Sequence, residues 1–136
     1  MPVVDASVAV KWFVEEPGSA DALDLLKGSD LVIAPELVVA EVANVVWKHL
    51  VRGDLKHQQL VQVPDALPKM FAELWPTVWL VRRALQIATE LRHPVYDCFY
   101  LALAEAEDAA VVTADRRLVQ RLSGTEWEAR CRLLVP

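Results

Sequence analysis

Short apolar runs alternate along this chain with longer stretches in which apolar residues recur at helical spacing. The short runs are rich in Val, Ile and Leu, and we predict them as strands at residues 2–5, 31–34, 109–113 and 132–135. Strands separated by helices favour a mainly parallel sheet that is covered on both faces. We therefore expect an α/β fold with three α/β/α layers around a short, mainly parallel central sheet.

Proline and glycine delimit the helical stretches. The longest predicted helix begins at Pro35, a residue suited to a first helical turn, and ends where Gly53 supplies a C-terminal stop. Prolines interrupt residues 55–92, which we predict as two or three further helices. The other predicted helices cover residues 6–16, 20–27, 95–108 and 115–122.

Size and composition favour one soluble domain. The 136 residues suffice for one hydrophobic core, and neither a linker nor a low-complexity segment divides residues 1–136. Hydrophobic residues make up 54% of the chain, too many for a disordered protein, yet no run without Asp, Glu, Lys or Arg exceeds eight residues. A membrane-crossing helix needs about 20 apolar residues, so we expect no membrane segment.

The first residues and the cysteines indicate the compartment. The opening MPVVDASVAV holds an early acid and no basic segment before a long apolar stretch, so we expect no signal peptide. Cys98 and Cys131 lie far apart and lack zinc-ligand spacing, as is typical of free thiols in a reducing compartment. We therefore expect a cytoplasmic protein.

The net charge limits how the chain can bind nucleic acid. Fourteen Lys and Arg against 19 Asp and Glu give −5, whereas a passive nucleic-acid coat binds through basic residues that neutralise phosphates. In an enzyme, bound cations can supply the positive charge instead. The composition thus disfavours a coat protein and leaves a metal-dependent enzyme open.

Two acids follow predicted strands, at the edge where α/β sheets bind their ligands. Asp5 ends the first strand, and Asp115 lies just beyond the strand at 109–113. Capping of the following helix explains Asp115 about equally well. It explains Asp5 less well, because Ser7 could cap that helix instead.

Two more acids lie on predicted helices. Glu41 shares a thin polar stripe with Asn44, Lys48 and Arg52 on an otherwise apolar helix, where the alternative is a solvated ridge. Asp97 opens an apolar helix, where the alternative is an N-cap. If the fold gathers these four carboxylates, they repel one another unless a hard cation such as Mg²⁺ or Mn²⁺ neutralises them. The pattern therefore predicts metal-dependent phosphoryl chemistry.

The segments around these acids resemble the PIN-domain family, and within it the VapC-type toxins of type II toxin–antitoxin modules. The matching segments follow the family's order along the whole chain: VVDASVAVKWF, APELVVAEVANVVWK, HPVYDCFYLALAEAED and VVTADRRL. The resemblance implies a PIN-like α/β fold and a homodimer. It also implies an endoribonuclease that depends on Mg²⁺ or Mn²⁺ and is restrained by a cognate antitoxin protein.

The resemblance also assigns site residues. The family's four acidic positions, which serve as catalytic residues and metal ligands, fall on Asp5, Glu41, Asp97 and Asp115. Thr113 falls on the family's Ser/Thr position, which supports the metal shell, and Ser7 and Asn44 match the local pattern more loosely. Since all four acids are present, we expect an active member.

Other protein classes remain as alternatives. A receiver domain needs an acid next to Asp5, and a haloacid-dehalogenase-type phosphatase needs an Asp where Ser7 stands. The chain has neither the G-x-S-x-G motif of serine hydrolases nor an HExxH zinc motif, and we interpret His93 before Pro94 as part of a surface turn. The non-enzymatic alternative is an α/β interaction module whose acids are caps and solvated ridges.

Basic residues beside the acids suggest how the chain holds RNA. Lys48 and Arg52 continue the Glu41 stripe, and three more basic residues follow Asp115. We predict that all of these flank the cleft and contact phosphates, the alternative being ordinary solvated charge. The three residues after Asp115 are Arg116, Arg117 and Arg121.

Two tryptophans near the acids suggest a place for the antitoxin. Trp12 and Trp47 lie on the helices that follow Asp5 and contain Glu41. Either they belong to the core, or they line a groove that receives apolar side chains of an antitoxin segment. In the second case, an Arg or Lys of that segment would reach the carboxylates.

Overall fold

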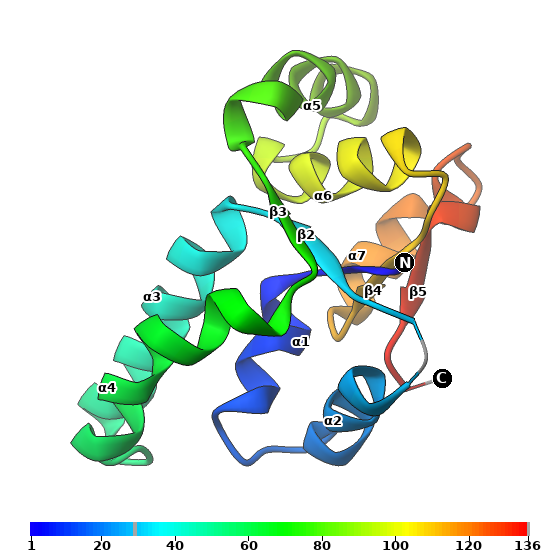
Figure 1. The fold of residues 1–136 in the computed structure, drawn as a ribbon. Coiled ribbons are helices and arrows are strands. Elements are labelled where there is room, and N and C mark those ends of the chain that lie inside the picture. The colour runs from blue at the N-terminus through cyan, green and yellow to red at the C-terminus, as the bar shows by residue number, and fades with distance from the viewer. Residues whose placement is uncertain (29, 136) are drawn as a thin grey trace.

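The computed structural model of the protein describes residues 1–28 and 30–135 and is built around a five-stranded sheet (Figure 1). The strand order is β3-β2-β1-β4-β5, and every neighbouring pair is parallel. The strands are β1 (Val3–Val4), β2 (Ile33–Pro35), β3 (Glu73–Trp75), β4 (Val111–Thr113) and β5 (Cys131–Leu133). The prediction of a short parallel sheet is therefore confirmed.

Helices cover both faces of this sheet. In chain order they are α1 (Ala6–Ala9), the 3-10 turn η1 (Val10–Trp12), α2 (Ser19–Lys27), α3 (Leu37–Arg52), α4 (His57–Ala66), η2 (Leu67–Met70), α5 (Thr77–Leu91), α6 (Val95–Ala106), α7 (Arg116–Leu122) and η3 (Glu128–Arg130). On one face α6 packs against β1, β2 and β4, and α5 packs on α6 (Figure 1). On the other face α1 contacts β4 and α3, while α3 and α4 lie side by side and point away from the sheet (Figure 1).

The core lies between the sheet and its covering helices. The three central strands β1, β2 and β4 consist mainly of Val, Ile and Ala and are buried throughout, as expected for parallel strands covered on both faces. Every residue of α6 from Cys98 to Ala104 is buried as well, because this helix lies between the sheet and α5. Both cysteines are buried free thiols. Among the described residues, no helix is long and apolar enough to cross a membrane.

The prediction of helices alone for residues 55–92 is wrong in one place, because β3 lies there. This strand has three residues, pairs only with β2 and stands at the sheet edge, with Glu73 exposed. A half-exposed edge strand has no run of buried β-branched residues, so its local pattern does not differ from that of a loop.

Two helix boundaries also differ from the predictions. Pro35 ends β2 and aligns with Trp75 of β3, so α3 begins only at Leu37, although it ends at Gly53 as predicted. The first helix stops at Trp12 rather than residue 16. Beyond it, the Ser19 hydroxyl accepts a hydrogen bond from the Glu16 N–H and donates one to the Val14 carbonyl, which satisfies this backbone outside a helix.

Candidate functional site

Asp5 stands at the carboxyl end of β1 and caps α1, and only 6% of it is exposed. The Ser7 hydroxyl donates to Oδ1 over 2.6 Å, the Thr113 hydroxyl donates to Oδ2 over 2.5 Å, and the Val8 N–H lies 3.3 Å from Oδ1. Burial raises the pKa of Asp5 to about 6, although these three hydrogen bonds lower it. Among the described residues, no basic side chain forms an ion pair with Asp5.

The two hydroxyls join the ends of two neighbouring strands. The parallel register pairs Val4 with Val112, which brings Asp5 beside Thr113. The Ser7 Oγ accepts the Ala114 N–H over 2.9 Å, and the Thr113 Oγ1 accepts the Asp115 N–H over 3.1 Å. Ser7 and Thr113 thereby fix both the Asp5 carboxylate and the backbone that leads to Asp115.

Asp115 begins α7 and is exposed. Its Oδ1 accepts the N–H groups of Arg117 and Leu118, over 2.9 Å and 3.4 Å. The capping role that we weighed from the sequence is therefore present. It uses one of the two carboxylate oxygens, so the cap does not prevent Asp115 from also binding a cation.

Glu41 projects from α3 and is partly buried. The Tyr100 hydroxyl of α6 donates to Glu41 Oε1 over 2.6 Å, and Tyr100 itself is only 2% exposed. Burial raises the pKa of Glu41, the charge of Asp97 raises it further, and the Tyr100 hydrogen bond lowers it. Tyr100 was not among the site residues predicted from the sequence, where its local signal is its position one helical turn after Asp97.

Asp97 lies in the first turn of α6 but does not cap it, because Pro94 occupies the N-cap position and no side chain caps this helix. Instead, Asp97 Oδ2 lies 2.6 Å from His93 Nε2. His93 lies in the turn between α5 and α6, as interpreted from the sequence, but its side chain is only 15% exposed and contacts Asp97. The signal that the sequence offered was the four-residue spacing between His93 and Asp97.

The structure brings the four acids to one cavity. Its volume is about 270 Å³, and its walls are Asp5, Ala6, Ser7, Glu41, Asn44, Val45, Asp97, Tyr100 and Asp115. Within the described residues, no three carboxylates stand close enough to form a closed metal cage. The carboxylate oxygens in the wall still fit Mg²⁺, which keeps several waters and takes one or two carboxylates directly.

None of the predicted RNA-binding residues is among the walls of this cavity. Lys48 and Arg52 are exposed on α3 beyond Asn44, and Arg117 is exposed at the start of α7. The Arg121 guanidinium instead donates to the carbonyls at the end of α5, at residues 91 and 92, over 3.0 Å and 2.8 Å. Arg121 therefore already serves as a cap of α5.

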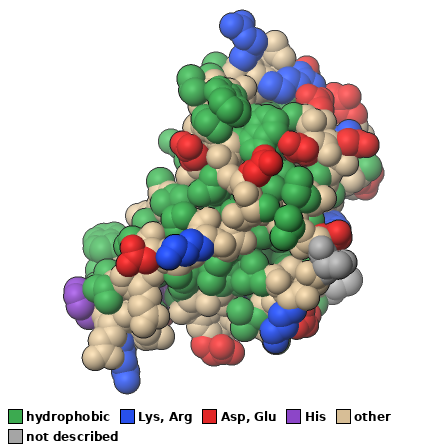
Figure 2. Space-filling view, viewed as in Figure 1, with side chains coloured by type: hydrophobic (Ala, Val, Ile, Leu, Met, Phe, Trp, Pro, Cys, Tyr) green, Lys and Arg blue, Asp and Glu red, His purple; other side chains and the backbone are tan. Residues whose placement is uncertain are grey.

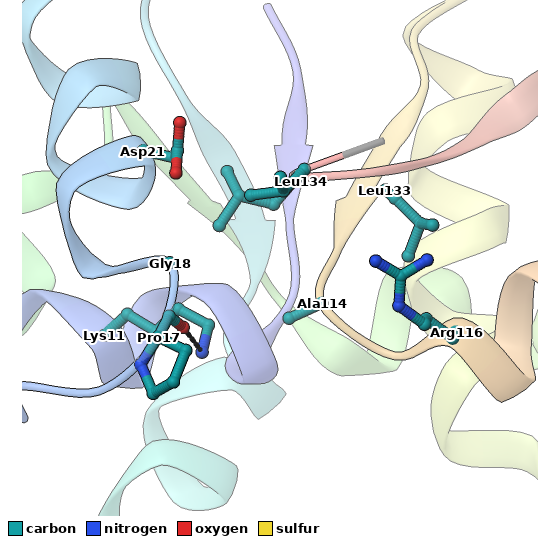
Figure 3. Close-up of a pocket in the computed structure, with 9 residues that line it drawn as sticks. Lys11, Pro17, Gly18, Asp21, Ala114, Arg116, Leu133 and Leu134 are labelled. Atoms are coloured by element: carbon teal, nitrogen blue, oxygen red, sulfur yellow. Dashed lines mark hydrogen bonds between the residues drawn. The ribbon is translucent and has the colours of Figure 1, made fainter.

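A second cavity, of about 400 Å³, adjoins the same β4–α7 connection (Figure 3). Arg116 lines it together with Ala114 and apolar residues of the C-terminal segment. Its second cation, Lys11, donates to the Pro17 carbonyl over 2.7 Å (Figure 3). Lys11 also pairs with Glu16 over 3.0 Å. This cavity therefore has mixed rather than basic walls.

The two tryptophans have different environments. Trp12 belongs to the core: its Nε1 donates to the Ala22 carbonyl over 2.9 Å, and its ring lies 5.4 Å from that of Phe71. The groove interpretation is therefore wrong for Trp12. Trp47 is 56% exposed on α3.

Comparisons with known proteins agree with this architecture. A profile of the PIN domain matches residues 3–123. Ribonuclease VapC3 of Pyrobaculum aerophilum is 31% identical over 121 residues, which cover 88% of this chain and 92% of that protein.

Solved structures share the fold at low sequence identity. The Mycobacterium tuberculosis toxin VapC20, described as cleaving the sarcin–ricin loop, has a TM-score of 0.70 and 14% identity, covering 96% of this chain and 99% of that one. A chain of a toxin–antitoxin complex from Klebsiella pneumoniae has a TM-score of 0.68 and 15% identity, covering 93% of both chains. The chain therefore belongs to the PIN-domain family, in its VapC group.

Proposed function

We propose that this protein is a metal-dependent endoribonuclease that hydrolyses RNA phosphodiester bonds as the toxin of a toxin–antitoxin pair. One observation carries the proposal: four carboxylates, from Asp5, Glu41, Asp97 and Asp115, line one cavity although they come from four separate elements. An interaction module would have no reason to gather them. The ribonuclease name of the relatives supports the same activity.

The proposed cofactor is Mg²⁺ or Mn²⁺. The buried anion of Asp5 has no basic partner among the described residues, and a cation beside it would favour the ionised form. Asp5, Asp97 and Asp115 are proposed to hold the cation directly or through water, and Glu41 to hold the cation or the attacking water. Such a cation would activate a water and offset the charge on the phosphate.

The reaction needs no covalent enzyme intermediate. The oxygen of a water attacks phosphorus, the bond between phosphorus and the leaving oxygen breaks, and that oxygen takes a proton from solvent. Glu41, whose pKa is raised by burial, is suited to accept the proton of the attacking water. Ser7 and Thr113 keep the Asp5 carboxylate in place throughout.

Replacement of Asp5 tests this function. We expect Asp5→Ala to abolish Mg²⁺-dependent cleavage of RNA while circular dichroism shows a retained fold. Asp24→Ala, which removes an exposed carboxylate on α2 outside the cavity, is the matched control and should cut RNA like the wild type. An Asp5→Ala protein that cuts RNA at the wild-type, metal-dependent rate would show that the proposal is wrong.

The antitoxin is proposed as a protein partner, supported by the toxin–antitoxin complex among the structural neighbours. Apolar side chains exposed on the α3–α4 pair, among them Trp47, Val51 and Val61, offer a surface for an apolar segment of that partner. The test is co-purification with the product of the neighbouring reading frame. A chain that binds no such partner and is harmless when expressed alone would contradict the toxin assignment.

A homodimer is proposed as well. Hydrophobic side chains gather over α5 (Figure 2), where Val78, Trp79 and Leu85 are 74%, 69% and 55% exposed. Such a patch favours association with a second copy. A monomer in sedimentation at micromolar concentration would contradict the homodimer.

The cytoplasm is proposed as the location, since RNA and a reducing environment for the two buried thiols are found there.

A further inference from the structure

We propose that Tyr100 and His93 are positioning residues, which aim the two helix-borne carboxylates of the active site, Glu41 and Asp97, at the bound cation. This inference rests on the proposed function, and neither residue was among the site residues expected from the sequence. Their role follows from how each carboxylate of the cavity is held.

The four carboxylates are anchored in two different ways. Asp5 and Asp115 are held by groups close to their own backbone, namely the Ser7 hydroxyl, the neighbouring strand and the first N–H groups of a helix. Glu41 and Asp97 instead project from the sides of α3 and α6. Each has one hydrogen bond to the protein among the described residues, and each would otherwise sample several rotamers.

Tyr100 connects Glu41 to the centre of the fold. Its ring is buried in α6, which packs on β1 and β4, so the phenol has a fixed place relative to the strands that lead to Asp5 and Thr113. The hydroxyl lies 2.6 Å from Glu41 Oε1, and no hydrogen bond to Oε2 is found among the described residues. Tyr100 thus fixes the rotamer of Glu41 and leaves one oxygen for the cation or its water.

His93 acts on Asp97 in the same way from the α5–α6 junction. Its backbone N–H donates to the Ala88 carbonyl over 3.1 Å, and it stands between Arg92, which caps α5, and Pro94, which caps α6. The backbone of His93 is therefore fixed within a short connection between the two helices. Because an ionised carboxylate only accepts hydrogen bonds, His93 Nε2 donates to Asp97 Oδ2 and leaves Oδ1 for the cation.

The test measures Mn²⁺ binding to the protein alone, by electron paramagnetic resonance, together with kcat and KM for RNA. Hydrogen-bond partners of metal ligands typically contribute about 10–100-fold in affinity. We expect Tyr100→Phe and His93→Ala each to weaken Mn²⁺ binding by about 10-fold and to change KM little. Tyr96→Phe, on the same helix and 59% exposed, is the matched control and should bind like the wild type.

Conservative rescue and double variants separate positioning from general packing. His93→Gln, whose amide can still donate to Asp97, should recover most of the affinity that His93→Ala loses. In a Glu41→Gln background, Tyr100→Phe should cause little further loss, because the carboxylate that it aims is gone. A wild-type affinity in Tyr100→Phe and His93→Ala, or a loss of equal size in the Glu41→Gln background, would overturn the proposal.

Failure of this proposal can be told apart from failure of the proposed function. A wild-type protein that neither binds Mn²⁺ nor cuts RNA overturns both. A wild-type protein that does both, with variants that bind Mn²⁺ equally well, overturns only the positioning role. Should Tyr100→Phe unfold, the His93 variants decide the question, because His93 is partly exposed and does not belong to the buried core.

Discussion

At the scale of single residues, Asp5 links the proposed active site to stability. Burial raises its pKa to about 6 from 3.8, so the folded protein holds this proton more tightly than the unfolded chain. The stability that this group contributes is therefore present below pH 4 and is lost as the pH rises through 6. Without metal, the free energy of unfolding should fall by on the order of 3 kcal/mol between pH 4 and pH 7 through this group alone.

Urea unfolding in EDTA across this pH range measures the effect. Asp5→Asn keeps the shape of the side chain and cannot titrate, so the difference between wild type and variant isolates the contribution of Asp5 from those of the other acids. As the pH rises, we expect the free energy of unfolding of Asp5→Asn to increase relative to that of the wild type. If the free energies of unfolding of wild type and Asp5→Asn changed in parallel with pH, the raised pKa of Asp5 would be contradicted.

The same carboxylate predicts how Mg²⁺ and pH act together. A proton and a cation compete for Asp5, so binding should be strong above pH 6 and weak below it. Millimolar Mg²⁺ should therefore raise the Tm of the wild type more at pH 7.5 than at pH 5, as measured by differential scanning fluorimetry. Asp5→Asn should show little shift at either pH, and an equal wild-type shift at both would argue against binding at this carboxylate.

The site residues also differ in how far the sequence could predict them. Asp5 and Asp115 come just after strands, so their positions suggest a site, and Thr113 lies in a segment that resembles the PIN-domain family. Tyr100 and His93 also lie in a matching segment, but they stand at no strand end and fall on none of the family's site positions, and their spacing from Asp97 is their only local signal. The partner of Tyr100 lies 59 residues away on another helix, so only the packing of α6 against the sheet and α3 shows what its hydroxyl does.

At the scale of elements, Gly53 is the C-cap residue of α3, and its replacement tests why this helix ends there. Its φ is +87°, and a Cβ there would meet nothing within 4 Å, so a side chain costs conformational energy and causes no clash. We expect Gly53→Ala to lower the free energy of unfolding by about 1 kcal/mol, measured in urea. Gly28, which follows α2 at a φ of −67°, is the matched control: Gly28→Ala should be neutral or slightly stabilising. Equal effects would contradict this account of the α3 C-terminus.

The elements that the sequence predicted well are those with strong local signals. The apolar periodicity of α3, its glycine stop and the buried runs of β1 and β4 depend only on neighbouring residues. By contrast, β3 exists because β2 offers an open edge, and Pro35 belongs to a strand because it aligns with Trp75. These pairings connect segments about 40 residues apart, and no local pattern contains them.

At the scale of the whole molecule, the strand order explains why the acids meet. β1 and β4 are neighbours at the centre of the sheet, although more than 100 residues separate them in the chain. Their carboxyl ends carry Asp5 and Asp115, while α3 and α6 bring Glu41 and Asp97 to the same cavity. A parallel sheet thus collects residues from the whole chain at one edge, which is why dispersed acids could be predicted to converge.

The proposed RNA substrate carries negative charge, as does this protein, whose net charge is −5. Binding has to depend on local cations, and Lys48 and Arg52 are exposed on α3 beyond the cavity. With Asp5→Ala to prevent cleavage, replacing both by Gln should weaken RNA binding. It should also flatten the slope of log K against log salt by about 1.4, since each lost phosphate contact of a single strand contributes about 0.7.

Arg132 on β5 provides a matched control. Arg132 lines a small cavity with Pro2 and Ala109, which precede β1 and β4, so Arg132→Gln removes an exposed charge that does not line the cavity of the acids. We expect its salt slope to match that of the Asp5→Ala parent, because a contact-specific effect depends on position and a net-charge effect does not. If the Lys48 and Arg52 replacements left the slope unchanged, these residues would not touch phosphates. If Arg132→Gln flattened it by about the amount expected per contact, the dependence would reflect total charge, and the RNA path would not follow α3.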